Sequence, residues 1–85
     1  MTGEQMLREA AAIVAGRQRT YGDPKVFMTT LAQRWSTTLG QPITPAQVVV
    51  CLIDLKVTRL AHDPKHQDSI CDLAGYAAIL QEVSQ

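Results

Sequence analysis

Two short polar motifs, Lys56-x-x-Arg59 and Asp68-x-x-x-Asp72, carry the ionisable side chains best suited to chemistry. At 100° per residue, each motif lies on one stripe of its own helix. Two carboxylates one turn apart can hold Mg²⁺, which prefers oxygen ligands and bridges to phosphates. A nearby Lys and Arg can neutralise phosphate oxygens, the Arg in a bidentate manner. The motifs therefore predict a binding site for a nucleotide or nucleotide-derived phosphate at the two helices that carry them.

Two tyrosines and a glycine extend this hypothesis. Tyr76 lies one turn beyond Asp72, and Tyr21 lies upstream, so that either ring could stack on a base. Gly75 leaves space on the acidic stripe for a ligand or a close helix. We expect the Lys/Arg motif and both tyrosines to contact substrate, and Asp68 and Asp72 to bind the metal. No nucleophile or general base is assigned.

The same residues also have a purely structural interpretation. Lys56 and Arg59 can pair with Asp68 and Asp72 across a helical hairpin, Asp68 can cap its helix, and Gly75 can allow close helix packing. Partly exposed ion pairs of this kind contribute less than about 1 kcal/mol each. The spacing is compatible with both interpretations.

Start and stop signals divide the chain into four helices. Capping residues followed by Pro or Gln predict the starts, and glycines predict the first two stops. The first helix is expected to end at Gly16, and Arg17 to Asp23 to form a loop. The resulting helices span residues 3–15, 24–39, 45–61 and 68–82.

The apolar residues repeat at helical spacing, which predicts one buried stripe per helix. Short connections between the helices favour antiparallel neighbours. We expect an all-α fold, a small antiparallel bundle of about four helices in a single domain over residues 1–85. The expected core includes Met6, Leu7, Ala10, Ala11, Ile13, Val14, Phe27, Met28, Leu31, Trp35, Leu39, Ile70, Leu73, Ala74, Ala77 and Leu80.

Charge and length limit the choice of partners. Eight basic and eight acidic residues cancel, which argues against a protein that coats nucleic acid. The mildly basic segment from Arg17 to Arg34 is more typical of a solvated face than of a phosphate site. With only 85 residues the core is small, so self-association into a homo-oligomer is expected to help stability.

Hydropathy and cysteine usage indicate the compartment. No apolar run approaches the roughly 20 residues that span a bilayer, and the first residues lack a signal-peptide profile. Cys51 and Cys71 both fall in predicted helices with apolar neighbours, so buried free thiols are expected. These features predict a cytoplasmic protein without a membrane partner.

A set of motifs along nearly the whole chain resembles a family of small phage and prophage proteins of unknown function. These motifs are Tyr21-Gly22-Asp23-Pro24, Trp35, Ile43-Thr44-Pro45, Leu55-Lys56-x-x-Arg59 and Asp68-Ser69-x-x-Asp72-Leu73-Ala74-Gly75-Tyr76. The resemblance implies a phage or prophage origin, the cytoplasm of a bacterial host, and a site made from the Lys/Arg and Asp/Asp motifs. It implies no known activity.

More distantly, the order Lys-x-x-Arg and then Asp-x-x-x-Asp-x-x-x-Tyr is similar to phage nucleotide-modification-associated domains. It is also similar to the all-α nucleoside-triphosphate pyrophosphohydrolases of the MazG and dimeric dUTPase type. Those enzymes hold Mg²⁺ between a Glu-x-x-Glu helix and a Glu-x-x-Asp helix. This chain departs from that pattern, because Glu4 and Glu9 are five apart and residues 45–61 offer only Asp54. A full metal site would therefore need a neighbouring subunit or another arrangement.

Two function classes follow. The first is a phage-type helical protein that binds a nucleotide-derived phosphate, with Mg²⁺-dependent pyrophosphate hydrolysis as its catalytic extension. The second is a non-enzymatic accessory protein that binds a host protein through a helical face and inhibits or recruits it. Whether the protein is an enzyme stays open at this point.

Overall fold

Four helices make up the part of the chain that the computed structural model describes, residues 1–84. They are α1 (Gly3–Tyr21), α2 (Pro24–Leu39), α3 (Pro45–His62) and α4 (Gln67–Val83). No strand occurs within residues 1–84, so the predicted all-α class is confirmed. Over the same residues, no helix is both long enough and apolar enough to cross a membrane.

The helix starts follow the capping signals. Thr2 and Thr44 each form a capping box, with Gln5 and Gln47 as the reciprocal partners. Asp23 accepts a hydrogen bond from the Lys25 backbone N–H at 2.8 Å. These bonds satisfy backbone donors that the first helical turn leaves without partners. The predicted starts of α1, α2 and α3 are therefore confirmed.

The predicted end of the first helix is wrong. The helix continues through Gly16 to Tyr21, and the expected loop from Arg17 is mostly its last turns. Gly22 ends the helix at φ 83° and ψ −161°, a region open almost only to glycine. Gly16 is tolerated in the helix because the residues after it, such as Arg17 and Gln18, favour helix.

The last helix begins at a different cap from the one considered. His66, and not Asp68, is its N-cap residue, and the His66 ring accepts from the Ser69 backbone N–H at 3.3 Å. The Ser69 hydroxyl lies 2.7 Å from His66 Nδ1 as well. Asp68 thus lies inside the first turn, where its negative charge interacts favourably with the positive end of the helix dipole.

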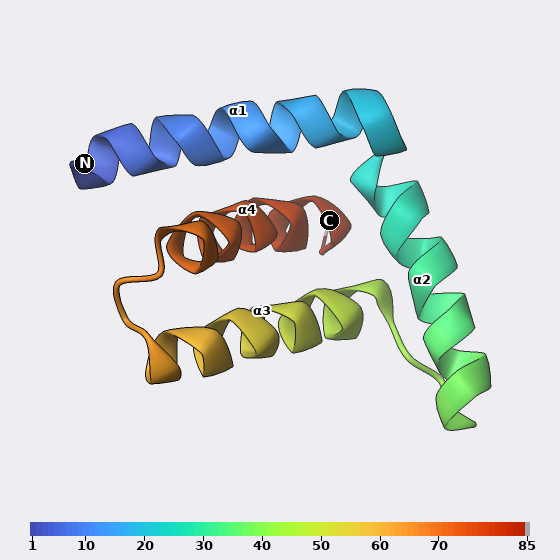
Figure 1. Ribbon diagram of the computed structural model, residues 1–85. Coiled ribbons are helices and arrows are strands. Elements are labelled where there is room, and N and C mark those ends of the chain that lie inside the picture. Colours follow the sequence, from blue (N-terminus) through green and yellow to red (C-terminus); the bar gives the residue numbers. More distant parts are fainter. Residues whose placement is uncertain (85) are drawn as a thin grey trace.

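Helix α4 lies between α1 and α3, and α2 crosses their ends (Figure 1). The most extensive contact joins α3 to α4, as the predicted hairpin requires, while α1 packs mainly on α4. Met28 and Ala32 of α2 meet Val48 and Val49 of α3 in the core, with Trp35 packed against them. The two N-terminal helices are joined by a short turn and touch little.

Several residues that we expected in the core are exposed instead. Leu7 is 59% exposed and Leu39 is 58% exposed, and Phe27 is 43% exposed. Leu7 is exposed because α1 has essentially one neighbour, α4, which covers only part of its apolar stripe. Phe27 lies in the first turn of α2, and Leu39 is the last residue of that helix. The remaining exposed members of the expected core are Ala11, Ile13 and Ala77. Cys51, which we expected to be a buried thiol, is exposed as well.

Gly16 and Gly22 allow a matched test of where the first helix ends. We expect Gly16→Ala to stabilise the protein by about 0.5–1 kcal/mol, because alanine restricts the unfolded chain and favours the helix. A Cβ at Gly16 would lie 3.6 Å from the Arg19 side chain, an ordinary contact. Gly22→Ala should cost about 1–3 kcal/mol, because φ is positive there.

The free energy of unfolding, measured by urea titration, reports both changes. Far-UV circular dichroism of each variant controls for helix content. Destabilisation by Gly16→Ala together with a neutral Gly22→Ala would contradict the observed end of α1.

Candidate functional site at an apolar cavity

A buried ion pair joins the two motifs that the sequence singled out. Lys56 Nζ on α3 lies 2.9 Å from Asp72 Oδ2 on α4. Lys56 is only 8% exposed. Because lysine is rarely buried without a partner, this burial depends on the pair with Asp72. This pair was anticipated by the structural interpretation of the motifs. The Lys56 ammonium and the Asp72 carboxylate are thus primarily partners of each other.

Arg17 supplies a second cation to the same carboxylate. Its Nη2 atom lies 3.8 Å from Asp72 Oδ1, and its side chain is about half exposed. The unexpected extension of α1 brings Arg17 to this position. Asp72 therefore connects three helices, with a short contact to α3 and a longer one to α1.

The importance of Arg17 was not recognised from the sequence. The expected loop from residue 17 placed it among solvated basic residues. Ala10 and Val14 precede Arg17 by seven and three residues on the same helical face, and both line one cavity with it. Continuing the apolar stripe past Gly16 would have placed Arg17 next to α4.

A cavity of about 470 Å³ opens beside Asp72, between α1, α2 and α4. Its wall is mostly apolar, with a polar section made by Arg17, Gln18 and Asp72. Leu52 is the contribution of α3. The apolar section includes Ile13 and Val14 of α1 and Phe27, Met28 and Leu31 of α2.

Tyr21 and Tyr76 both line this cavity, although they are 55 positions apart in sequence. Tyr21 is 64% exposed, and its ring centroid lies 5.8 Å from that of Phe27 at an interplanar angle of 59°. Tyr76 is half-buried and packs against the core. The structure thus gathers two of the predicted substrate contacts with Asp72.

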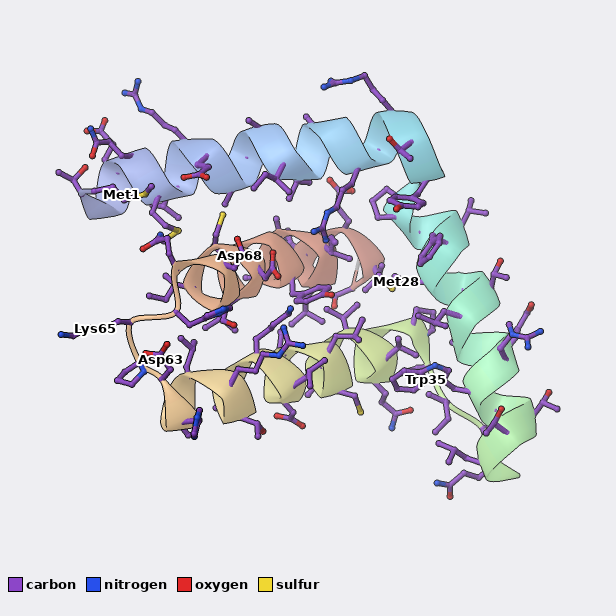
Figure 2. All side chains as sticks on the ribbon, viewed as in Figure 1. Met1, Met28, Trp35, Asp63, Lys65 and Asp68 are labelled. Atoms are coloured by element: carbon purple, nitrogen blue, oxygen red, sulfur yellow. The ribbon has the colours of Figure 1, made fainter. Side chains whose placement is uncertain are left out.

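Arg59 and Asp68 do not join this group. Both are exposed, neither lines the cavity, and neither pairs with any residue from 1 to 84. Figure 2 shows Asp68 at the start of α4, near the turn that carries Asp63 and Lys65. The residues chosen from sequence therefore divide between the cavity, its supporting ion pair and the open surface.

The described residues do not fit a magnesium ion held by protein ligands alone. Within residues 1–84, no three His, Cys, Asp or Glu side chains are grouped closely enough for a metal. Asp72 also has a cation near each of its oxygens. Any Mg²⁺ here would need phosphate oxygens and water as most of its ligands.

Cys71 is a buried free thiol in the cavity wall, as expected, whereas Cys51 is exposed. Burial, followed by the carboxylates of Glu9, Asp72 and Asp68, raises the pKa of the Cys71 thiol, and Arg17 opposes this effect. The thiol therefore stays protonated at neutral pH. Because the thiolate is the nucleophilic form of cysteine, the protonated Cys71 thiol is not a nucleophile and serves as a small apolar part of the wall.

Single and double variants of the ion pair test how strongly it is coupled. Asp72→Asn should destabilise the protein by about 3 kcal/mol, because it leaves the Lys56 ammonium buried without a counterion. Lys56→Met should cost less, about 1 kcal/mol, because Asp72 keeps Arg17 and some solvent. The free energy of unfolding of the double variant should lie within about 1 kcal/mol of the wild-type value.

Urea unfolding of the four proteins completes a double-mutant cycle. The pair of variants Glu4→Gln and Arg8→Met is a matched control, since that exposed pair at 2.8 Å contributes little. Additive losses at Lys56 and Asp72 would contradict the assigned coupling.

Comparison with known proteins places the chain in a family. Residues 5–84 match the family model described as a domain of unknown function, DUF6378. The chain is 36% identical over 80 residues to the Gene 55 protein of Mycobacterium phage L5, covering 92% of this chain and 51% of that protein. It is 31% identical over 81 residues to the Gene 55 protein of Mycobacterium phage D29, covering 94% and 54%.

These matches limit what is shown. The chain spans about half the length of each of the two phage proteins. No solved structure matches it. A relation to the all-α pyrophosphohydrolases is not shown by these matches, whereas the resemblance to small phage proteins is confirmed. The chain belongs to the DUF6378 family of phage proteins, whose function is unknown.

Proposed function

We propose that this domain binds a small ligand with a flat ring and a phosphate group, a nucleotide or close derivative, in the cavity between α1, α2 and α4. The supporting observation is a mostly apolar cavity of about 470 Å³ with an arginine and two tyrosines in its wall. Ligand sites are usually cavities of roughly 300–1,000 Å³ with few, well-placed polar groups. The dimensions and the lining both meet this description.

Arg17 is the phosphate-binding residue in this proposal. Its 3.8 Å contact with Asp72 is longer than a hydrogen bond, and half of the side chain is exposed. The guanidinium group thus has donors free for a bidentate contact with a phosphate. Asp72 limits the positions that the guanidinium group can take. Arg17 replaces Lys56 and Arg59 in the role predicted from sequence, because Lys56 is engaged and Arg59 lies outside the cavity.

The tyrosines are the ring-binding residues. Tyr21 is largely exposed at the cavity and already contacts an aromatic neighbour, Phe27. Tyr76 contributes a second ring from α4. Offset or tilted stacking on such rings contributes roughly 1 kcal/mol beyond the apolar area that it buries. Magnesium enters this proposal only together with the phosphate.

Titration calorimetry with mono-, di- and triphosphates of purine and pyrimidine nucleosides, with and without Mg²⁺, tests the site. Arg17→Ala should weaken the binding of the best ligand by about tenfold or more, because hydrogen bonds to charged groups contribute roughly 1.5–3 kcal/mol. Arg19→Ala is the matched control, since Arg19 is exposed on the same helix and does not line the cavity.

The outcome that rejects the proposal is the absence of binding by any nucleotide, or equal weakening by both arginine variants. Analysis of the ligand after incubation separates binding from hydrolysis. Release of pyrophosphate would extend the proposal to catalysis, and an intact ligand would limit it to binding.

A protein partner is the second candidate function, and the outer face of α3 favours it. Val50, Leu55 and Val57 are 45%, 47% and 49% exposed, respectively. Exposed apolar side chains on one helix are typical of contacts with another protein. The relatives come from phages that infect mycobacteria, so a host protein is the partner that fits this candidate.

Affinity capture from a mycobacterial lysate tests this second candidate. A specific partner should be bound by the wild type and lost with Val57→Glu, because a charge on α3 would have to be desolvated in the contact. Lys65→Glu, on the turn after α3, is the control and should retain the partner. Capture that survives Val57→Glu would exclude this face.

A further inference from the structure

The folded chain exposes more surface than a protein of its size usually does. Its accessible area is 5851 Å², whereas a monomer of 9.3 kDa is expected to expose about 5,000 Å². The excess is roughly 800–900 Å², which is the area that each partner contributes to a standard protein interface. The radius of gyration, 13.6 Å, likewise exceeds the roughly 12 Å expected for 85 residues. The unburied excess is thus similar in size to one side of a standard interface.

A shallow apolar groove lies where α1 packs on α4 and adjoins the proposed ligand cavity, since Ala10, Val14, Gln18 and Gly75 line both. Its volume is about 330 Å³. Leu7, Ala11 and Ala15 line the groove, whereas Ile13 and Arg17 line the cavity. At 100° per residue these two sets occupy different faces of α1. From α4 the groove receives only Ala74, Gly75 and Ala78, so its floor is smooth.

We propose that a second copy of this chain occupies the groove, with α1 packed antiparallel on the partner's α1 around a two-fold axis near Ala11. In that alignment Leu7 lies opposite the partner's Ala15, and the partner's Leu7 lies opposite Ala15. Leu7 is 59% exposed, which makes it an apolar side chain ready to fill a groove of small residues. A two-fold interface requires such self-complementarity, because each copy presents the same surface.

The charges along α1 favour the antiparallel arrangement. Glu4 lies on the same side of α1 as Leu7 and falls opposite the partner's Gln18 and Arg19. Opposite charges then face each other at both ends of the contact, whereas a parallel arrangement would oppose Glu4 to its own copy. Glu4 is free to change partner, since its pair with Arg8 is more than 70% exposed on both sides.

The exposed stripe of α3 is less suitable for a second copy. Asp54 and Arg59 are exposed on the same helix, and none of Val50, Leu55 and Val57 lines the cavity or the groove. A dimer through α3 would leave these charges facing apolar side chains. The α1–α4 groove combines an exposed leucine, a complementary hollow and paired charges, and α3 serves as the comparison in the experiment.

Light scattering coupled to size-exclusion chromatography measures the mass in solution. At micromolar concentrations the wild type should have twice the chain mass of 9.3 kDa. Leu7→Glu should have the single-chain mass, because the carboxylate would be buried against alanines. Val57→Glu, at a similarly exposed apolar site, should remain a dimer. Unchanged circular dichroism shows that each variant is folded.

A monomeric wild type, or a dimer that survives Leu7→Glu, overturns the proposal. Loss of the dimer with Val57→Glu alone moves the interface to α3 and overturns it as well. These results are independent of the nucleotide titrations, because neither Leu7 nor Val57 lines the ligand cavity.

Cross-linking tests the position of the axis. In a Cys51→Ser background, which removes the exposed thiol, oxidised Ala11→Cys should form a disulfide-linked dimer. Thr58→Cys, exposed on α3, should not. Arg19→Glu should weaken the dimer, and adding Glu4→Arg to the same chain should restore it. A linked dimer from Thr58→Cys but not from Ala11→Cys contradicts the arrangement.

Discussion

The Asp72 carboxyl group is half-buried between three helices, and much of the arrangement of this protein depends on how that group is paired. A carboxylate loses hydration when it is buried, and the cost is recovered only if cations and hydrogen bonds replace the water. Lys56 meets this need from α3 at 2.9 Å, and Arg17 approaches from α1 at 3.8 Å. Because each cation comes from a different helix, the charge of Asp72 favours one relative placement of α1, α3 and α4.

The same carboxylate belongs to the polar section of the cavity between α1, α2 and α4. Around Asp72 the wall is apolar, and Cys71 next to it stays a neutral thiol because burial raises its pKa. A single anion with two unequal cation contacts leaves the weaker partner, Arg17, available to another anion. In the proposed function, the short pair with Lys56 stabilises the fold, whereas Arg17, at the longer distance, binds the ligand.

Helix α4 connects this site with the rest of the surface. One side of α4 meets α3, and α1 lies on another (Figure 1). Gly75 lies at the contact with α1, where a Cβ would be 3.5 Å from Val14 Cγ2. The small residues of α4 bring α1 close and also leave the groove beside it with a smooth floor. Because α1 contacts little else, Leu7 and Ile13 of α1 stay exposed.

Local signals in the sequence determined the helix starts, because each cap is satisfied within three residues, as at Thr2, Asp23 and Thr44. They also identified Lys56, Asp72, Tyr21 and Tyr76 as residues of interest. Only the tertiary structure decided that α1 passes Gly16, that Arg17 reaches Asp72, and that Arg59 and Asp68 stay at the surface. The physical reason is the distance along the chain over which each interaction acts. A cap is formed by residues of its own helix, whereas a buried charge depends on which other helices pack against it.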